Sequence, residues 1–78
     1  MTEPIVVNGV YITGRLRAYV PRMPAPGIGN PGMTVKDLRR AMRMAVSMEP
    51  YIEAAAEVLR SEGVLKCYYG YWFKAVTT

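Results

Sequence analysis

The chain has 78 residues, of which 51% are apolar, and it carries a formal charge of +4 at pH 7. This length predicts a single domain spanning 1–78, and the apolar fraction excludes a disordered chain. The longest uninterrupted apolar runs are only a few residues, so we expect no membrane span and no membrane partner.

The residue types that the chain lacks exclude most kinds of chemistry. It contains no histidine and one aspartate, Asp37, so the commonest general base and the commonest metal ligands are scarce. We therefore expect a protein that is not an enzyme and that has no catalytic residues, metal or cofactor. The single cysteine, Cys67, cannot form an internal disulfide, and residues 1–4 lack the features of a signal peptide. Together these observations predict a cytoplasmic location.

The N-terminal segment begins with a hairpin signal. β-Branched residues flank the Asn8-Gly9 dipeptide within residues 5–12. A tight hairpin needs positive φ at both turn positions, and Asn-Gly is the pair that adopts it most easily. Residues 5–12 are therefore expected to form two short antiparallel strands.

Residues 13–20 fit two structures. Alternation through Leu16, Ala18 and Val20 is typical of a strand. Helical spacing instead places Leu16 and Val20 on one face, behind a possible N-cap at Thr13. We favour the helix and leave the strand open.

A proline- and glycine-rich segment follows over residues 21–33. Four prolines and three glycines lie between Pro21 and Gly32, which excludes a regular helix or a central strand. The segment is predicted to be a loop of about a dozen residues, and loops of that length in small domains are either functional or loosely ordered.

The first long helix is expected to begin after Thr34. Thr34 and Asp37 have the spacing of a capping box, and a carboxylate in the first turn is favoured by the helix dipole. An apolar stripe runs from Val35 to Val46, so we expect the helix to end near Val46. Four basic residues share the adjoining face of this helix: Lys36, Arg39, Arg40 and Arg43.

A second helix is expected from about Ser47 to Ser61. Pro50 suits a first helical turn, and Gly63 suits a left-handed stop. Its apolar residues cover more than a third of its circumference, which predicts the most buried helix of the chain. Its remaining polar strip is mainly acidic and consists of Glu49, Glu53, Glu57 and Arg60.

Residues 64–76 are rich in β-branched and aromatic side chains around Gly70, and they predict a second hairpin. Strand alternation must turn about half of the aromatic residues inward. We expect Trp72 or Phe73 in the core and Tyr69 or Tyr71 exposed at the tip. Cys67 is expected to be a small core residue rather than a reactive thiol.

The apolar residues and glycines from Val35 to Val76 follow an order seen in one family of folds. A leucine in the first helix and an apolar residue in the turn precede a second helix with apolar-x3-apolar-x2-leucine-x3-glycine spacing. The positions concerned are Leu38, Val46, Ile52, Ala56, Leu59 and Gly63, followed by Val64-Leu65. This order resembles a winged helix-turn-helix domain, and Tyr71-Trp72-Phe73-Lys74 resembles the last strand of small regulators of the pilus-operon type.

The resemblance implies an α+β fold. It would consist of an N-terminal hairpin or short helix over 1–20, the loop over 21–33, and a helix-turn-helix plus wing over 34–78. The sequence differs from the usual winged helix-turn-helix pattern in two ways. The turn between the helices is about three residues longer than usual, and the second helix is acidic. Such domains insert that helix into the major groove, where glutamates would repel phosphate.

The positive net charge and the resemblance to winged helix-turn-helix domains together predict a function. We expect a small basic protein that binds double-stranded DNA as a regulator or accessory factor in transcription, replication or recombination, with homodimerisation adding contacts. The contacts would come from the basic helix, the start of the second helix, the hairpin and an N-terminal arm. The predicted residues are Lys36, Arg39, Arg40, Arg43, Ser47, Tyr51, Lys66, Tyr69, Lys74, Arg15 and Arg17.

Two other interpretations remain open. The basic face could be solvated or could pair with the glutamates of the neighbouring helix, and Arg15, Arg17 and Arg22 could be ordinary surface arginines. The chain could also be a non-enzymatic protein-interaction module, an inhibitor or adaptor. Its contact surface would then be the acidic second helix and the tyrosine-rich hairpin.

Overall fold

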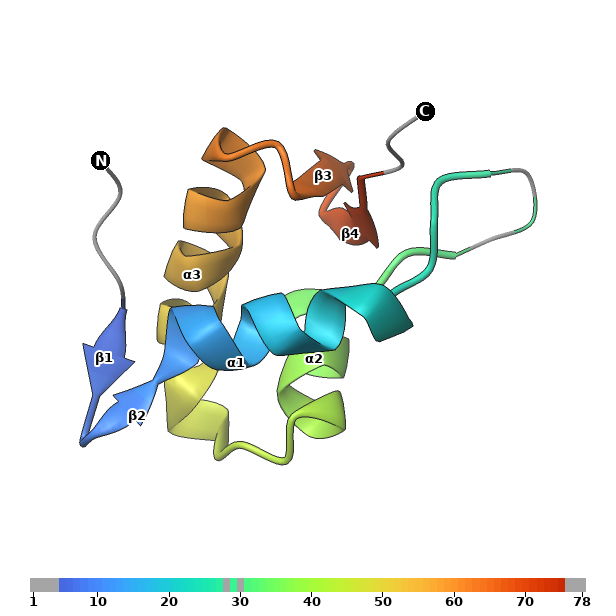
Figure 1. The fold of residues 1–78 in the computed structure, drawn as a ribbon. Helices are drawn as coiled ribbons and strands as arrows, with labels where there is room; N and C mark the ends of the chain where they lie inside the picture. The colour runs from blue at the N-terminus through green and yellow to red at the C-terminus, as the bar shows by residue number, and fades with distance from the viewer. Residues whose placement is uncertain (1–4, 28, 30, 76–78) are drawn as a thin grey trace.

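The computed structural model describes residues 5–27, 29 and 31–75, which form an α+β fold with three helices and a C-terminal antiparallel hairpin (Figure 1). In chain order the elements are β1 (Val6–Val7), β2 (Val10–Tyr11), α1 (Ile12–Tyr19), η1 (Val20–Arg22), α2 (Val35–Ala41), η2 (Val46–Met48), α3 (Glu49–Ser61), β3 (Leu65–Tyr68) and β4 (Tyr71–Lys74). No described helix is both long and apolar enough to cross a bilayer.

The predicted N-terminal hairpin is confirmed. β1 and β2 pair antiparallel, and Asn8 and Gly9 take φ values of 51° and 79° at the turn. Helix α1 follows β2 directly, so residues 13–20 are mainly helical and the strand alternative is wrong. Thr13 is not the N-cap, because the helix begins before it. Its side chain is instead buried, and its Oγ1 accepts a hydrogen bond from the Ile5 amide at 2.7 Å.

The loop between α1 and α2 is attached to β4 at both of its ends. Pro21 lies in the first turn of the short 3₁₀ helix η1, which begins at Val20, so the first two residues of the predicted loop are helical, because proline suits a first helical turn. The Lys74 amide donates to the Pro24 carbonyl at 3.0 Å. Met33 and Trp72 exchange two backbone hydrogen bonds, of 3.0 and 2.7 Å, at the outer edge of β4.

Helix α2 begins as predicted but ends early. The capping box is present, with Asp37 N to Thr34 Oγ1 at 3.2 Å and Thr34 N to Asp37 Oδ2 at 3.1 Å. The expected end near Val46 is wrong, because α2 stops at Ala41 and the chain turns through Arg43 at φ 57°. The turn lets the next segment fold back toward α3, and it leaves Val46 66% exposed instead of buried.

Helix α3 ends at Ser61 as predicted, begins at Glu49 after the short helix η2, and supplies more core residues than any other element. Pro50 lies in its first turn, and Gly63 takes φ 81° after its last. Its buried face packs against α1, α2 and β3, but the expectation that it is the most buried helix is wrong, because α1 buries three of its eight residues and α3 four of its thirteen. The core as a whole consists of Ile12, Leu16, Met23, Leu38, Met42, Ile52, Ala55, Ala56, Leu59, Leu65 and Trp72.

The C-terminal hairpin is also confirmed. Tyr68 of β3 pairs with Tyr71 of β4 across a two-residue turn at Tyr69 and Gly70, both with positive φ. Trp72 is 3% exposed, Phe73 next to it is buried as well, and Tyr69 is 99% exposed at the tip. The core and tip expectations for the aromatic residues therefore both hold.

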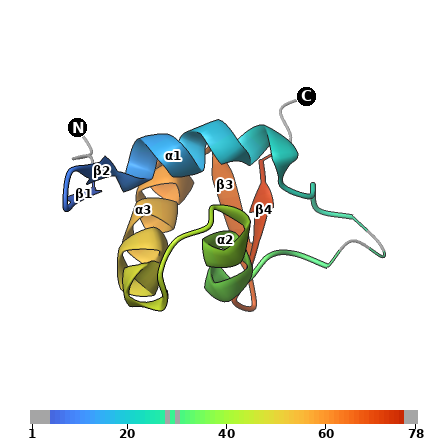
Figure 2. The ribbon, with the colours of Figure 1, turned by 90° about the horizontal axis from the view of Figure 1, so that it is seen from below.

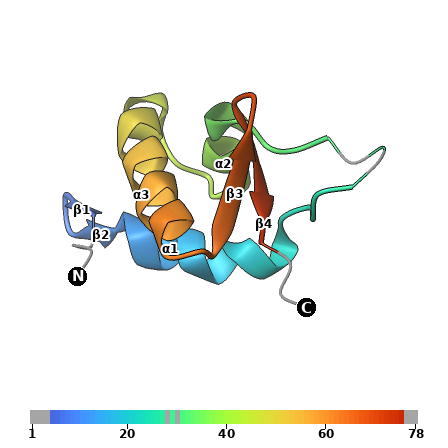
Figure 3. The same ribbon diagram turned by 90° about the horizontal axis from the view of Figure 1, so that it is seen from above.

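The helices and the C-terminal hairpin are arranged around α1. Figures 2 and 3 show α1 lying across one end of the molecule, while α2, α3 and the β3–β4 hairpin extend away from it. The first turns of α2 and α3 and the tip of the hairpin lie at the opposite end. This arrangement is compatible with a winged-helix-like fold.

Candidate functional site

Ion pairs within the chain engage three of its cationic side chains. Arg17 lies 2.8 Å from Glu62, Arg39 lies 2.6 Å from Glu49, and Arg60 lies 2.7 Å from Glu57. The side-chain hydrogen bond that Arg17 donates to Glu62 raises the pKa of Arg17, and the one that Arg60 donates to Glu57 raises the pKa of Arg60. Two of the residues predicted to contact DNA, Arg17 and Arg39, are therefore partnered inside the molecule.

Arg39 has the most extensive internal contacts of these three. Its side chain is only 14% exposed, its Nε donates to Glu49 Oε2, and its Nη1 donates to the Met44 carbonyl at 3.1 Å. These bonds join the end of α2 to the first turn of α3 across the bent connection. The position of Arg39 therefore supports a structural role in this turn, as the glutamate-pairing alternative anticipated.

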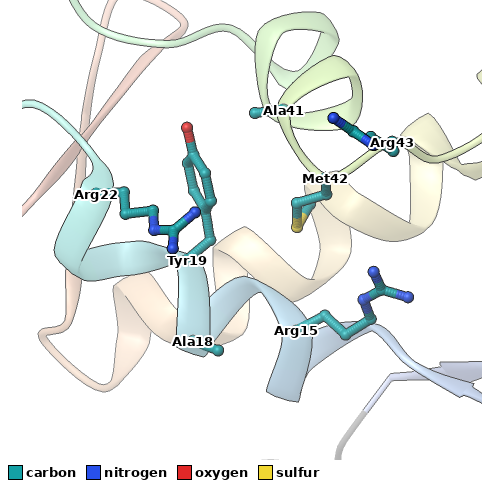
Figure 4. A pocket seen from close by; sticks show the side chains of 7 residues that line it. All are labelled: Arg15, Ala18, Tyr19, Arg22, Ala41, Met42 and Arg43. Atoms are coloured by element: carbon teal, nitrogen blue, oxygen red, sulfur yellow. The ribbon is translucent and has the colours of Figure 1, made fainter.

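A cavity with a cationic lining lies between α1 and the C-terminal end of α2 (Figure 4). We call it the arginine groove, and its volume is about 470 Å³. It is lined by Arg15, Ala18, Tyr19, Arg22, Ala41, Met42 and Arg43. Three guanidinium groups thus share one cavity to which the described part of the chain contributes no carboxylate.

Two separate stretches of chain build the arginine groove. Arg15, Tyr19 and Arg22 are spaced i, i+4 and i+7, so α1 and η1 carry them along one face. The opposite wall is the end of α2, where Met42 enters the core and Arg43 lies at the rim (Figure 4). Sequence reasoning named Arg15 and Arg43 but assigned them to different surfaces.

Arg43 occupies a backbone position that favours glycine. Helices α2 and α3 end with the same motif, in which the amides after the C-cap donate back to the last turn. The bonds are Arg43 N to Arg40 O (3.1 Å) and Met44 N to Arg39 O (3.0 Å) in α2, and Gly63 N to Arg60 O (3.0 Å) and Val64 N to Leu59 O (2.9 Å) in α3. This Schellman motif places one residue in the left-handed region.

The two motifs differ in the residue at that left-handed position. Helix α3 uses Gly63, at φ 81°, whereas α2 uses Arg43, at φ 57°. A left-handed conformation costs a residue with a side chain roughly 1–2 kcal/mol. The chain therefore keeps a guanidinium at the rim of the groove against the local preference of the backbone.

The other predicted contact residues lie elsewhere. Lys36 and Arg40 are exposed on α2, Ser47 is exposed on η2 and Tyr51 near the start of α3, and none of the four lines the arginine groove. On the hairpin Lys66 is exposed and Lys74 is half-buried at its base. Tyr69 lines a separate cavity of about 340 Å³, together with Pro31, Gly32, Tyr68, Tyr71 and Phe73.

Sequence reasoning missed two groove residues as contacts. Tyr19 is absent from the predicted contact residues, and Arg22 enters the sequence analysis only beside Arg15 and Arg17 as a possible surface arginine. The signal that could have found them is the i, i+4, i+7 spacing from Arg15 once 13–20 is taken as helical. No cluster of three potential metal ligands occurs among the described residues.

Comparison with known proteins adds no functional assignment. No known protein family, no curated protein and no solved structure matches the chain.

Proposed function

We propose that this protein binds nucleic acid without catalysing a reaction and holds backbone phosphates in the arginine groove. The observation that carries the proposal is Arg43. It occupies a left-handed position that favours glycine, and it lines one cavity with Arg15 and Arg22. If the Arg43 side chain stabilised the fold through an ion pair, its guanidinium would need a carboxylate partner within the protein. The described residues offer Arg43 no carboxylate within ion-pairing distance.

The groove has the chemistry that a phosphodiester needs. A guanidinium binds two phosphate oxygens at once and stays charged at any physiological pH. The phenol of Tyr19 adds a neutral hydrogen-bond donor on the same wall. Two or three neighbouring arginines without a carboxylate would repel one another in the free protein, so a bound anion relieves that repulsion as well as forming new bonds.

Charge elsewhere on the molecule supports attraction to a polyanion. Outside the three ion pairs, the other cationic side chains have no carboxylate partner among the described residues. They comprise Arg15, Arg22, Lys36, Arg40, Arg43, Lys66 and Lys74. A field of one sign steers a polyanionic ligand toward the surface and raises its rate of association.

We further propose that the fold is a winged helix that does not use α3 as a major-groove reading helix. The outer face of α3 carries Glu53, which has no cationic partner among the described residues, and Glu57, which pairs with Arg60. Negative charge on that face opposes insertion between two phosphate backbones. Contacts through the arginine groove would be directed at the backbone and tolerant of sequence, as suits an accessory factor in transcription, replication or recombination.

The salt dependence of DNA binding tests this proposal. Fluorescence anisotropy would compare the wild type with the double variant Arg15→Gln/Arg43→Gln between about 50 and 200 mM salt. For each phosphate that the variant no longer neutralises, the slope of log affinity against log salt should fall by about 0.9 on duplex and about 0.7 on single strands.

The matched control is Arg40→Gln/Lys66→Gln, which removes the same charge from exposed positions outside the groove. If the two double variants lose affinity and slope equally, binding depends on net charge alone and the groove has no special role. If no DNA binds even at the lowest salt, the proposal is wrong.

A second function, association with a second copy of this chain, is favoured by a different observation. Tyr69 is 99% exposed and adopts φ 53°, again at a position that favours glycine or asparagine. Tyr68 and Tyr71 beside it are half exposed. Such a tip would suit the surface of a homodimer. Sedimentation of the wild type and of Tyr69→Asn tests this, because a dimer that the variant turns into a monomer supports it and a wild-type monomer excludes it.

A further inference from the structure

A second cavity adjoins the arginine groove. Its volume is about 240 Å³, and it shares Arg15 and Arg43 with the groove. The other residues that line it are Val7, Asn8, Val10, Met44, Ala45 and Met48. The same two guanidinium groups therefore lie between a cationic cavity and a mainly apolar one, which we call the methionine cavity.

The walls of the methionine cavity are apolar and held in place. Val7 and Val10 come from the β1–β2 hairpin, while Met44 and Met48 come from the connection between α2 and α3. All four are partly buried and pack against the hydrophobic core. Methionine side chains are flexible and polarisable, so they adapt to the faces of flat apolar ligands.

A single uncharged polar side chain reaches this cavity from the described residues. Asn8 lies at the turn of the β1–β2 hairpin, with φ 51°. Its amide offers donors and an acceptor, the combination that pairs with the edge of a nucleobase. The turn fixes its backbone, so the amide stands at a defined place beside the apolar walls.

We infer that the two cavities together form a site for one unpaired nucleotide of a single strand. The phosphate would bind Arg15 and Arg43, with Arg22 beside the next phosphate. The base would enter the methionine cavity with its faces against Met44, Met48 and the valines. This inference rests on the proposed function, because it names the form of nucleic acid that the arginine groove holds.

The inference requires an unpaired base for a geometric reason. In a duplex each base is stacked and paired, and its faces are inaccessible to a protein. A base can fill an apolar cavity next to its own phosphate only in a single strand or after it has flipped out. Duplex DNA would reach the arginine groove with its phosphates and leave the methionine cavity without a ligand.

The experiment compares two single strands of about 12 nucleotides. One is oligothymidylate, and the other has the same length and charge but abasic sugars throughout. The wild type should bind oligothymidylate roughly fivefold to tenfold more tightly than the abasic strand, a ratio at the low end for contacts to a base. It should also bind oligothymidylate more tightly than duplex of equal length.

Two variants locate the base. Asn8→Gly removes the amide and keeps a residue that accepts the left-handed turn. Ala45→Phe places a ring in the methionine cavity from an exposed position, so it leaves the core untouched. Both should lose the preference for oligothymidylate over the abasic strand and keep the affinity for the abasic strand. Circular dichroism would verify that each variant is folded.

The outcomes separate the two proposals. Salt-dependent binding of all three ligands, with equal affinity for the abasic strand and oligothymidylate, overturns the nucleotide site and leaves the phosphate-binding function standing. Tighter binding to duplex than to oligothymidylate overturns it in the same way. A preference for bases that survives both variants also overturns it, because the base would then bind elsewhere. Failure of all three ligands to bind removes both proposals.

Discussion

Replacing Arg43 by glycine should separate stability from binding. Relief of the left-handed conformation at φ 57° is worth roughly 1–2 kcal/mol. Glycine loses about 0.5–1 kcal/mol of that gain, because it makes the unfolded chain more flexible. The net expectation is that Arg43→Gly unfolds with a free energy about 0.5–1 kcal/mol higher than the wild type, while its affinity for nucleic acid falls.

The molecule offers a matched control at the end of α3. Gly63 occupies the equivalent position, at φ 81°, and a methyl group added there would meet no atom within 4 Å beyond the adjacent residues of the chain. Gly63→Ala should therefore show the conformational effect alone and destabilise the protein by about 1 kcal/mol. The pair of variants measures the same backbone preference in opposite directions.

Urea unfolding monitored by fluorescence is a suitable assay. Trp72 is the single tryptophan and is 3% exposed, so its emission reports the core. With a slope near 1 kcal/mol per molar urea, Arg43→Gly should raise the midpoint by about 0.5–1 M. A lower midpoint for Arg43→Gly would show that the guanidinium stabilises the fold, and unchanged binding would show that it contacts no ligand. Either result refutes the reasoning that assigns Arg43 to the site.

Three further changes test the structural contacts by thermal or urea unfolding. Arg39→Ala should lower the free energy of unfolding by about 1.5–2.5 kcal/mol, because it removes a charged hydrogen bond and leaves Glu49 half-buried and unpaired. Arg40→Ala is the control, and it should change stability by less than about 0.5 kcal/mol; equal effects would contradict the structural role. Thr13→Val should cost about 1–2 kcal/mol by leaving a backbone amide without its acceptor, and Thr13→Ser should cost less. Gly32→Ala should cost about 1–3 kcal/mol, since its methyl group would lie 2.7 Å from a side-chain atom of β4, and full stability would mean that the loop is not packed there.

The sequence alone determined the elements whose signals are local. Asn8-Gly9 produced a hairpin because the residues that prefer positive φ lie next to each other in the chain. Thr34 and Asp37 produced a capping box for a similar reason, since both partners lie within one helical turn. The amphipathic pattern and the glycine after it set the extent of α3. These features depend on neighbours within a few residues, and the sequence displays those neighbours directly.

Only the tertiary structure decided where α2 ends and which arginines are free of ion pairs among the described residues and could bind a ligand. The apolar pattern continues to Val46, but the helix stops at Ala41 because the chain must turn for α2 and α3 to share one core. That turn brings Arg39 against Glu49 and places Arg43 in the lining of a cavity shared with α1.

The arginine groove likewise depends on a long-range contact. Arg15 and Arg43 are far apart in the chain and meet only after the helices have packed. The composition could predict a basic protein, but the distribution of its arginines between ion pairs and an open cavity depends on distances that exist only in the folded state.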